Sequence, residues 1–134
     1  MKLLSLDIGK KRIGVAISNS GIIAREYETI KNTSIKDVIT YVDDVITKEE
    51  IEKLIVGLPK SMDGQDSEYT KYVRDFTKEI ANHLKIDIIF EDERLTTNEA
   101  KRQLINVGAS DEEIKNRIDQ YSAKLILDQY LGNY

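Results

Sequence analysis

The order of short apolar runs and amphipathic segments is the feature that most restricts the fold of this chain. Three apolar runs come first, at 2–9, 12–18 and 21–30, and the tight-turn signal "NSG" separates the last two. Two more runs follow later, each after a stretch with helical periodicity, at 52–59 and 85–93. The pattern predicts five strands, of which the first three are consecutive.

Four helices are predicted from the 3.6-residue spacing of apolar residues. The first begins after Ser34, which is placed to act as its N-cap. Two capping boxes, Thr96 with Glu99 and Ser110 with Glu113, mark the starts of two others. The expected helices cover residues 35–50, 69–84, 97–107 and 111–131.

This order predicts an α/β fold in which a mixed five-stranded sheet carries helices on its faces. The 134 residues are enough for one domain, 1–134, with its own core. In such sheets, functional sites form at the carboxyl ends of the strands. The residues at those ends therefore carry most of the functional information.

Composition limits the possible functions. There is no cysteine, which excludes disulfides and thiolate metal sites and suits a cytoplasmic protein. No apolar stretch is long enough to span a bilayer, so no membrane association is expected. The net charge of −4 gives no overall attraction to nucleic acid, so binding to a polyanion would need a local basic patch or bound cations.

Three acidic positions are expected to converge. Asp7 ends the first strand, Asp92 and Glu93 end the fifth, and Asp119 lies on the last helix. Hard oxygen ligands that meet from different elements are what Mg²⁺ or Mn²⁺ requires for phosphodiester hydrolysis. Neighbouring strand residues face opposite sides, so register decides between Asp92 and Glu93; we expect Glu93 to point into the site.

Asp119 shares a helix stripe with Ser122, Ala123 and Ile126. The two small residues would let the helix lie close to the sheet, so that Asp119 can reach the end of the first strand. Taken singly, each acid has an ordinary explanation as a turn residue, a surface ion pair or a solvated helix residue. The combination is what favours a site.

Basic residues lie beside these acids in the chain. Lys11 and Arg12 follow Asp7, Arg94 follows Glu93, and Lys60 precedes a polar loop that contains glycine. These four are the predicted contacts to substrate phosphates, although charge runs also commonly just face solvent. The tyrosines have the spacing of a helix core, which does not indicate a base-stacking surface.

Four segments together resemble the YqgF (RuvX) family of Holliday-junction resolvases and pre-16S rRNA nucleases. They are "SLDIGKKRIGVAIS", "LIVGLPKSMDGQDSEYTKYVRDF", "FEDERLTTNEA" and "RIDQYSAKLILDQYL". The resemblance implies a ribonuclease H-like fold and a cytoplasmic nuclease that depends on a divalent metal. It also implies catalytic carboxylates at Asp7, at the acid of "DER" and at Asp119. Asn19 after Ser18 departs from the aspartate that members often carry there, and Ser122-Ala123 replaces their paired alanines.

The sequence therefore predicts a nuclease in which Asp7, Glu93 and Asp119 bind two cations and cleave precursor rRNA or branched DNA. The reactions expected are 5′ end maturation of pre-16S rRNA and Holliday-junction resolution. A two-fold-symmetric junction would favour a homodimer. Two alternatives stay open: a non-catalytic ribosome-assembly module that binds nucleic acid, and an actin-like nucleotide-binding domain, which "LDIGKKRIG" also resembles.

Overall fold

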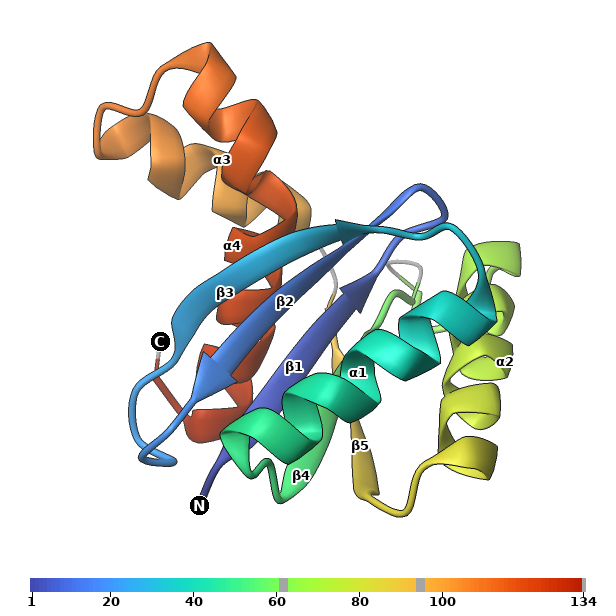
Figure 1. Ribbon diagram of the computed structural model, residues 1–134. Helices are drawn as coiled ribbons and strands as arrows, with labels where there is room; N and C mark the ends of the chain where they lie inside the picture. Colours follow the sequence, from blue (N-terminus) through green and yellow to red (C-terminus); the bar gives the residue numbers. More distant parts are fainter. Residues whose placement is uncertain (61–62, 94–95, 134) are drawn as a thin grey trace.

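The computed structural model describes residues 1–60, 63–93 and 96–133 and shows a single sheet with helices on both faces (Figure 1). Its elements, in chain order, are β1 (Leu3–Ile8), β2 (Arg12–Ser18), β3 (Arg25–Lys31), α1 (Ile35–Glu49), β4 (Lys53–Leu58), α2 (Glu68–His83), β5 (Asp87–Asp92), α3 (Thr96–Asn106) and α4 (Asp111–Leu131).

The sheet has five strands in the order β3-β2-β1-β4-β5. The β1–β2 and β2–β3 pairs are antiparallel, whereas β1–β4 and β4–β5 are parallel. The predicted mixed five-stranded sheet is confirmed. Because β1, β4 and β5 run in the same direction, their carboxyl ends lie at one edge of the sheet.

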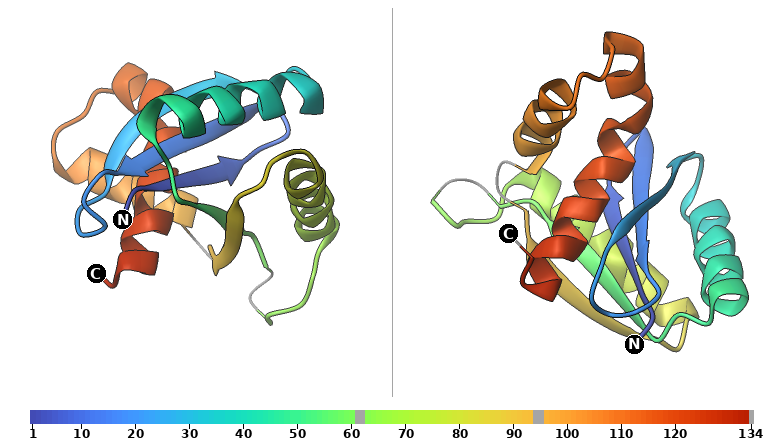
Figure 2. Two further views of the ribbon diagram at one scale, coloured as in Figure 1. Left: turned by 60° about the horizontal axis from the view of Figure 1, so that its bottom comes forward. Right: turned by 90° about the vertical axis from the view of Figure 1, so that its left-hand side faces the viewer.

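Each face of the sheet is covered by a different set of helices (Figure 2). Helices α1 and α2 cover one face, where Val42 and Ile80 pack on strand residues such as Leu4 and Val56. Helix α4 crosses the other face, and α3 packs against α4. Among the described residues, no helix is both long enough and apolar enough to cross a membrane.

Local signals in the sequence fix most helix starts. The Ser34 hydroxyl accepts the N–H of Asp37, and Ser110 forms a capping box with Glu113, both as predicted. Ser67 forms a further capping box with Thr70, which the sequence analysis did not identify.

Several predicted boundaries differ from the observed ones, most of them by one residue. Helix α3 includes Thr96, one residue earlier than predicted, so Thr96 lies within the helix and is not its N-cap. Strand β3 begins at Arg25, and residues 21–24 lie in the turn before it, where Gly21 has a φ of 76°.

Helix α4 lies unusually close to the sheet at Gly14. A Cβ atom added to Gly14 would stand 1.8 Å from the carbonyl oxygen of Asp119, so only glycine fits here. Ser122 and Ala123 are buried at the same contact, and the Ser5 hydroxyl donates to the Ala123 carbonyl at 2.8 Å. The predicted close approach of this helix through small residues is confirmed.

Replacing Gly14 by alanine should therefore destabilise the protein. The added methyl group meets helix backbone, which cannot rotate away, and overpacking of this kind costs about 1–3 kcal/mol. We expect a loss of about 3 kcal/mol in the free energy of unfolding, measured by urea denaturation.

Gly108→Ala is the matched control. Gly108 has a φ of 83° but no atom within 4 Å of its added Cβ, so this change should cost only the left-handed conformation, about 1 kcal/mol. Equal losses for the two variants would contradict the importance of the contact between α4 and the sheet.

Candidate active site

The candidate site lies at the edge of the sheet where β1, β4 and β5 end. Asp7 is the penultimate residue of β1 and is paired in register with Gly14 of β2. Glu93 follows the last residue of β5, and its backbone N–H donates to the Leu58 carbonyl at 3.2 Å. Since α4 passes over Gly14 at Asp119, three elements bring their acidic residues to one region.

Asp7 and Glu93 form the centre of the site. Their carboxyl groups are within hydrogen-bonding reach of each other, and both residues are partly buried. Two carboxylates in such contact repel each other strongly. Either one of them keeps a proton, or a cation lies between them. The structure therefore brings together the two acids that the sequence analysis placed at separate strand ends.

Glu93 occupies a position that Gly57 makes possible. A Cβ atom on Gly57 would lie 2.2 Å from Glu93 Oε2 and 2.4 Å from the Ile126 side chain, so the missing side chain leaves room for the carboxylate. Glu93 Oε2 is buried and has no hydrogen-bond partner among the described residues. A buried acceptor without a partner is costly, and such an atom is usually explained by a function or a bound ion.

The electrostatics of the pair follow from this burial. Burial, followed by the negative charge of Asp7, raises the pKa of Glu93 well above its ordinary range. Burial is also the main cause that raises the pKa of Asp7, and the charge of Asp119 adds to it. Without a cation, the pair therefore retains a proton at a pH at which isolated carboxyls have lost theirs.

Asp119 lies beside this pair but is held by another residue. Its carboxylate accepts a hydrogen bond from Arg12 Nε at 2.8 Å, although the two residues are 107 positions apart. The side chain of Asp119 is 25% exposed and that of Arg12 is 55% exposed. Asp119 therefore lies at the rim of the buried face, as predicted. Arg12 is the positively charged partner of its carboxylate.

The donor set fits a divalent cation only in part. Within residues 1–60, 63–93 and 96–133, no group of three or more acidic, histidine or cysteine side chains is arranged to hold a metal ion. Asp7 and Glu93 do offer hard oxygen ligands, one of which is the unpartnered Glu93 Oε2. A cation at the pair fits this chemistry, and Asp119 would become available once Arg12 releases it.

Of the remaining predicted residues, Lys11 and Lys60 form no ion pair or hydrogen bond with the acid pair in the part of the chain that the structure describes. Asp92 is exposed, and Glu93, the acid that we preferred of the two, is the one that contacts Asp7. Lys11 is exposed in the turn between β1 and β2. Lys60 is partly buried, and its positive charge favours the ionised form of Asp66. Arg94 lies outside the described residues.

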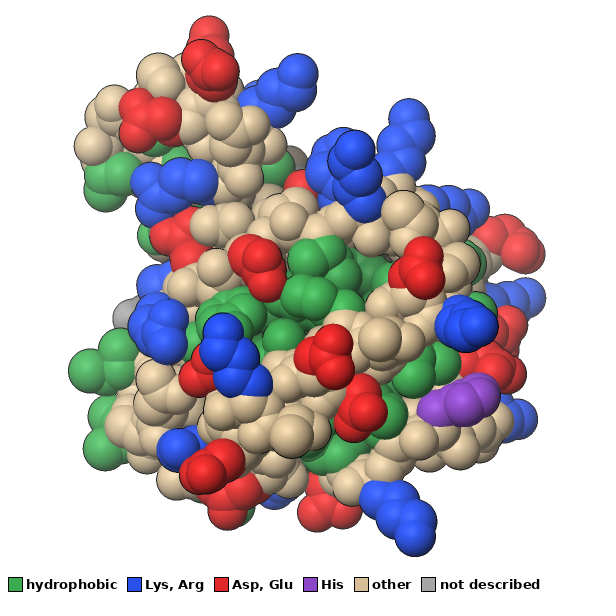
Figure 3. Space-filling view, viewed as in Figure 1, with side chains coloured by type: hydrophobic (Ala, Val, Ile, Leu, Met, Phe, Trp, Pro, Cys, Tyr) green, Lys and Arg blue, Asp and Glu red, His purple; other side chains and the backbone are tan. Residues whose placement is uncertain are grey.

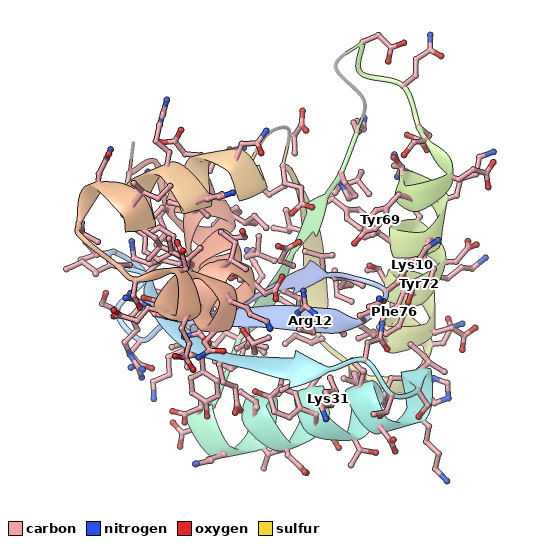
Figure 4. All side chains as sticks on the ribbon, turned by 90° about the horizontal axis from the view of Figure 1, so that it is seen from above. Lys10, Arg12, Lys31, Tyr69, Tyr72 and Phe76 are labelled. Carbon is pink, nitrogen blue, oxygen red and sulfur yellow. The ribbon has the colours of Figure 1, made fainter. Side chains whose placement is uncertain are left out.

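Sequence reasoning missed Tyr69 as part of this region. Its hydroxyl donates to the carbonyl of Ile8, next to Asp7, and its pKa is raised first by burial and then by the charges of Asp7 and Glu93. Figure 4 shows Tyr69 on α2, on the side of that helix toward the sheet. Helical spacing alone indicated a core residue, and no sequence signal distinguishes a core tyrosine from one at a site.

Comparison with solved structures identifies the class of fold. The chain is similar to RuvC of Thermus thermophilus in complex with a Holliday junction substrate, with a TM-score of 0.60 and 13% identity over 98% of this chain and 96% of that one. It is also similar to the Fowlpox virus resolvase bound to Holliday junction DNA, with a TM-score of 0.56, 18% identity and coverage of 98% and 97%. The predicted ribonuclease H-like fold is confirmed.

Sequence comparison gives the family. Residues 1–133 match the model of the RuvX family, described as Holliday junction resolvase, and the chain belongs to this family. A relative from Caldanaerobacter subterraneus subsp. tengcongensis is 40% identical over 99% of this chain and 97% of its own length. One from Thermoanaerobacter pseudethanolicus is 42% identical with the same coverage. Both are named "Putative pre-16S rRNA nuclease".

The raised pKa of Glu93 predicts a pH-dependent effect of Glu93→Gln. Below the ordinary value of 4.5, folded and unfolded chains both carry the proton, so Glu93 costs nothing. As the pH rises above 4.5, only the unfolded state releases it, and the wild type loses stability that the glutamine variant keeps. We expect the variant to be more stable by about 2 kcal/mol at pH 7 in EDTA.

Urea unfolding from pH 5 to pH 8 measures this difference. Glu112→Gln, at an exposed helix position, is the control and should show no such trend. A difference between Glu93→Gln and wild type that stays constant over this range would contradict the raised pKa.

Proposed function

We propose that this protein is a divalent-metal-dependent endonuclease that hydrolyses phosphodiesters in structured RNA or branched DNA. The observation that carries the proposal is the contact between Asp7 and Glu93 at the strand edge of a ribonuclease H-like sheet. Membership of a resolvase family supports it, and favours a nuclease over an actin-like nucleotide-binding domain.

Asp7, Glu93 and Asp119 are the residues proposed to hold Mg²⁺ or Mn²⁺. When bound, such an ion supplies an activated water and stabilises the charge of the leaving oxygen. Asp7 is central because it contacts Glu93 and lies within electrostatic range of Asp119. Its burial fixes the orientation of the carboxyl group before a substrate arrives.

Arg12 has two candidate partners, Asp119 and a substrate phosphate. Its guanidinium is more than half exposed, and guanidinium geometry matches phosphate oxygens as well as it matches a carboxylate. We infer that a substrate phosphate forms an ion pair with Arg12 in place of Asp119, and that the Asp119 carboxylate then becomes available to a cation. Lys11, Lys60 and Arg94 remain predicted contacts to the rest of the backbone.

Two substrates are proposed. The names of the relatives indicate the precursor of 16S rRNA, and 5′ end maturation is the step we propose. The family description and the junction-bound structural neighbours indicate four-way DNA junctions. A cytoplasmic location and a homodimer on two-fold-symmetric junctions are part of the same proposal.

Asp7→Asn should abolish cleavage while the fold is kept. Asparagine retains the shape of the side chain but removes the charge needed to bind a cation, so the rate should fall about 100-fold or more. The assay uses a 5′-extended 16S rRNA fragment and a four-way DNA junction, each with Mg²⁺ and with Mn²⁺. Asp44→Asn, on the exposed side of α1, is the control.

Unchanged cleavage by folded Asp7→Asn would remove this residue from the mechanism. If the wild-type protein binds both substrates yet cleaves neither with either ion, the non-catalytic ribosome-assembly module becomes the better account.

Arg12→Gln should weaken nucleic-acid binding at every sequence tested. Loss of one phosphate contact lowers the slope of log affinity against log salt concentration by about 1. Fluorescence anisotropy with the same junction in EDTA, from 50 to 200 mM salt, measures the slope. Lys48→Gln removes an equal charge at the far end of α1, and should leave the slope as in wild type; a wild-type slope for Arg12→Gln would place Arg12 outside the interface.

A further inference from the structure

A shallow groove lies between the start of α1 and the middle of α2. It has a volume of about 200 Å³ and is lined by Ile35, Tyr72, Asp75, Phe76 and Glu79. Pockets for small-molecule ligands usually measure about 300–1,000 Å³, so this one has room for a single flat ring. Its walls are aromatic and aliphatic, and two exposed carboxylates stand at its rim.

A row of aromatic side chains on α2 extends from the groove toward the candidate active site. Three aromatic rings follow one another along α2, with centroid distances of 6.1 Å from Tyr69 to Tyr72 and 5.8 Å from Tyr72 to Phe76. Tyr69, at one end of the row, donates its hydroxyl to Ile8, next to Asp7. Phe76, at the other end, lines the groove, and Figure 4 shows the three rings one after another along α2.

Hydrogen bonds through Asn32 connect Tyr72, which lines the groove, to the turn between β1 and β2. The Asn32 side-chain amide donates to the Gly9 carbonyl and to the Tyr72 hydroxyl, both at 2.9 Å. The Asn32 backbone N–H donates to the Lys11 carbonyl at 2.9 Å. The turn and the ring of Tyr72 therefore keep a fixed relation to each other.

That turn carries positive charge to the edge of the groove. Lys10 Nζ lies 5.6 Å from the centroid of the Tyr72 ring. Lys11 and Lys31 are also exposed, and in the part of the chain that the structure describes no carboxylate forms an ion pair with these three lysines. Lys and Arg side chains gather near this turn in Figure 3, although the whole chain has a net charge of −4.

We propose that the groove binds an unpaired base of the nucleic-acid strand that enters the active site. The base lies against the Tyr72 ring, next to the small exposed part of Phe76 (8%), and its phosphate contacts Lys10. This inference rests on the proposed nuclease function and adds a requirement for a single-stranded segment next to the cleaved bond. Stacking on an aromatic ring beside a basic track is how single strands are commonly held.

The rim carboxylates add a base preference. Asp75 and Glu79 make no ion pair or side-chain hydrogen bond with any other described residue, so both are available as acceptors. Carboxylates accept hydrogen bonds from exocyclic amino groups such as N4 of cytosine, whereas uracil has an oxygen at that position. The groove should therefore favour cytosine over uracil, two rings of equal size.

The test compares three RNA hairpins that share one stem. One is blunt, one has a 5′ extension of six cytidines, and one has a 5′ extension of six uridines. Binding is measured by fluorescence anisotropy in EDTA, so that no cleavage occurs. We expect the cytidine extension to bind about tenfold more tightly than the blunt hairpin, and about threefold more tightly than the uridine extension.

Three variants locate the effect. Tyr72→Leu removes the ring and should abolish the advantage of both extensions, whereas Tyr72→Phe keeps the ring and should retain it. Lys10→Gln should weaken binding of the extended hairpins more than binding of the blunt one. Lys48→Gln is the charge control, and circular dichroism confirms that each variant is folded.

Equal affinity for blunt and extended hairpins, or a full advantage in folded Tyr72→Leu, would overturn the proposal. Equal affinity for cytidine and uridine extensions would overturn the role of Asp75 and Glu79. Cleavage by the wild-type protein with Mn²⁺ is measured separately on the four-way junction. Its absence would count against the nuclease function alone, because the binding assay requires no catalysis.

Discussion

The close contact of α4 with the sheet at Gly14 is the constraint on which the site depends. The carbonyl of Asp119 lies where any Cβ on Gly14 would be, so the helix can approach only because that residue has no side chain. The Ser5 hydrogen bond to Ala123 and the ion pair of Arg117 with Glu26 hold the helix along the same face. Asp119 is thereby brought to the strand edge that carries Asp7.

Within that frame, the acid pair lowers the stability of the protein locally, which agrees with the role proposed for it. Asp7 and Glu93 lie together and are partly buried, and the buried atom Glu93 Oε2 lacks a hydrogen-bond partner among the described residues. A structure selected for stability alone would place an amide or an apolar side chain here, as the expected gain from Glu93→Gln illustrates. The well-packed core around the pair, in which Leu6 and Val56 are fully buried, offsets this loss of free energy of unfolding.

Much of this arrangement follows from sequence because it depends on periodicity and strand direction. The strand and helix order predicts the mixed sheet, and strand ends predict where Asp7 and Glu93 lie. The pairing of Arg12 with Asp119 was not predictable, because it joins residues 107 positions apart through side-chain conformations. The space that Gly57 leaves for Glu93 is likewise a property of packing between elements, and Tyr69 has the spacing of an ordinary core residue.

The distribution of charge explains how a chain of net charge −4 can serve a polyanionic substrate. Two acids form a partly buried pair, which is proposed to bind a cation, and exposed lysines lie on the turn that follows Asp7 in the chain. Arg12, at the start of β2, lies between these two regions, because it pairs with Asp119 beside the acid pair and exposes more than half of its side chain. Under the proposed function, a phosphodiester that arrives with a divalent cation would provide partners for the acidic and the basic side chains together, whereas either alone would leave one set of charges without a partner.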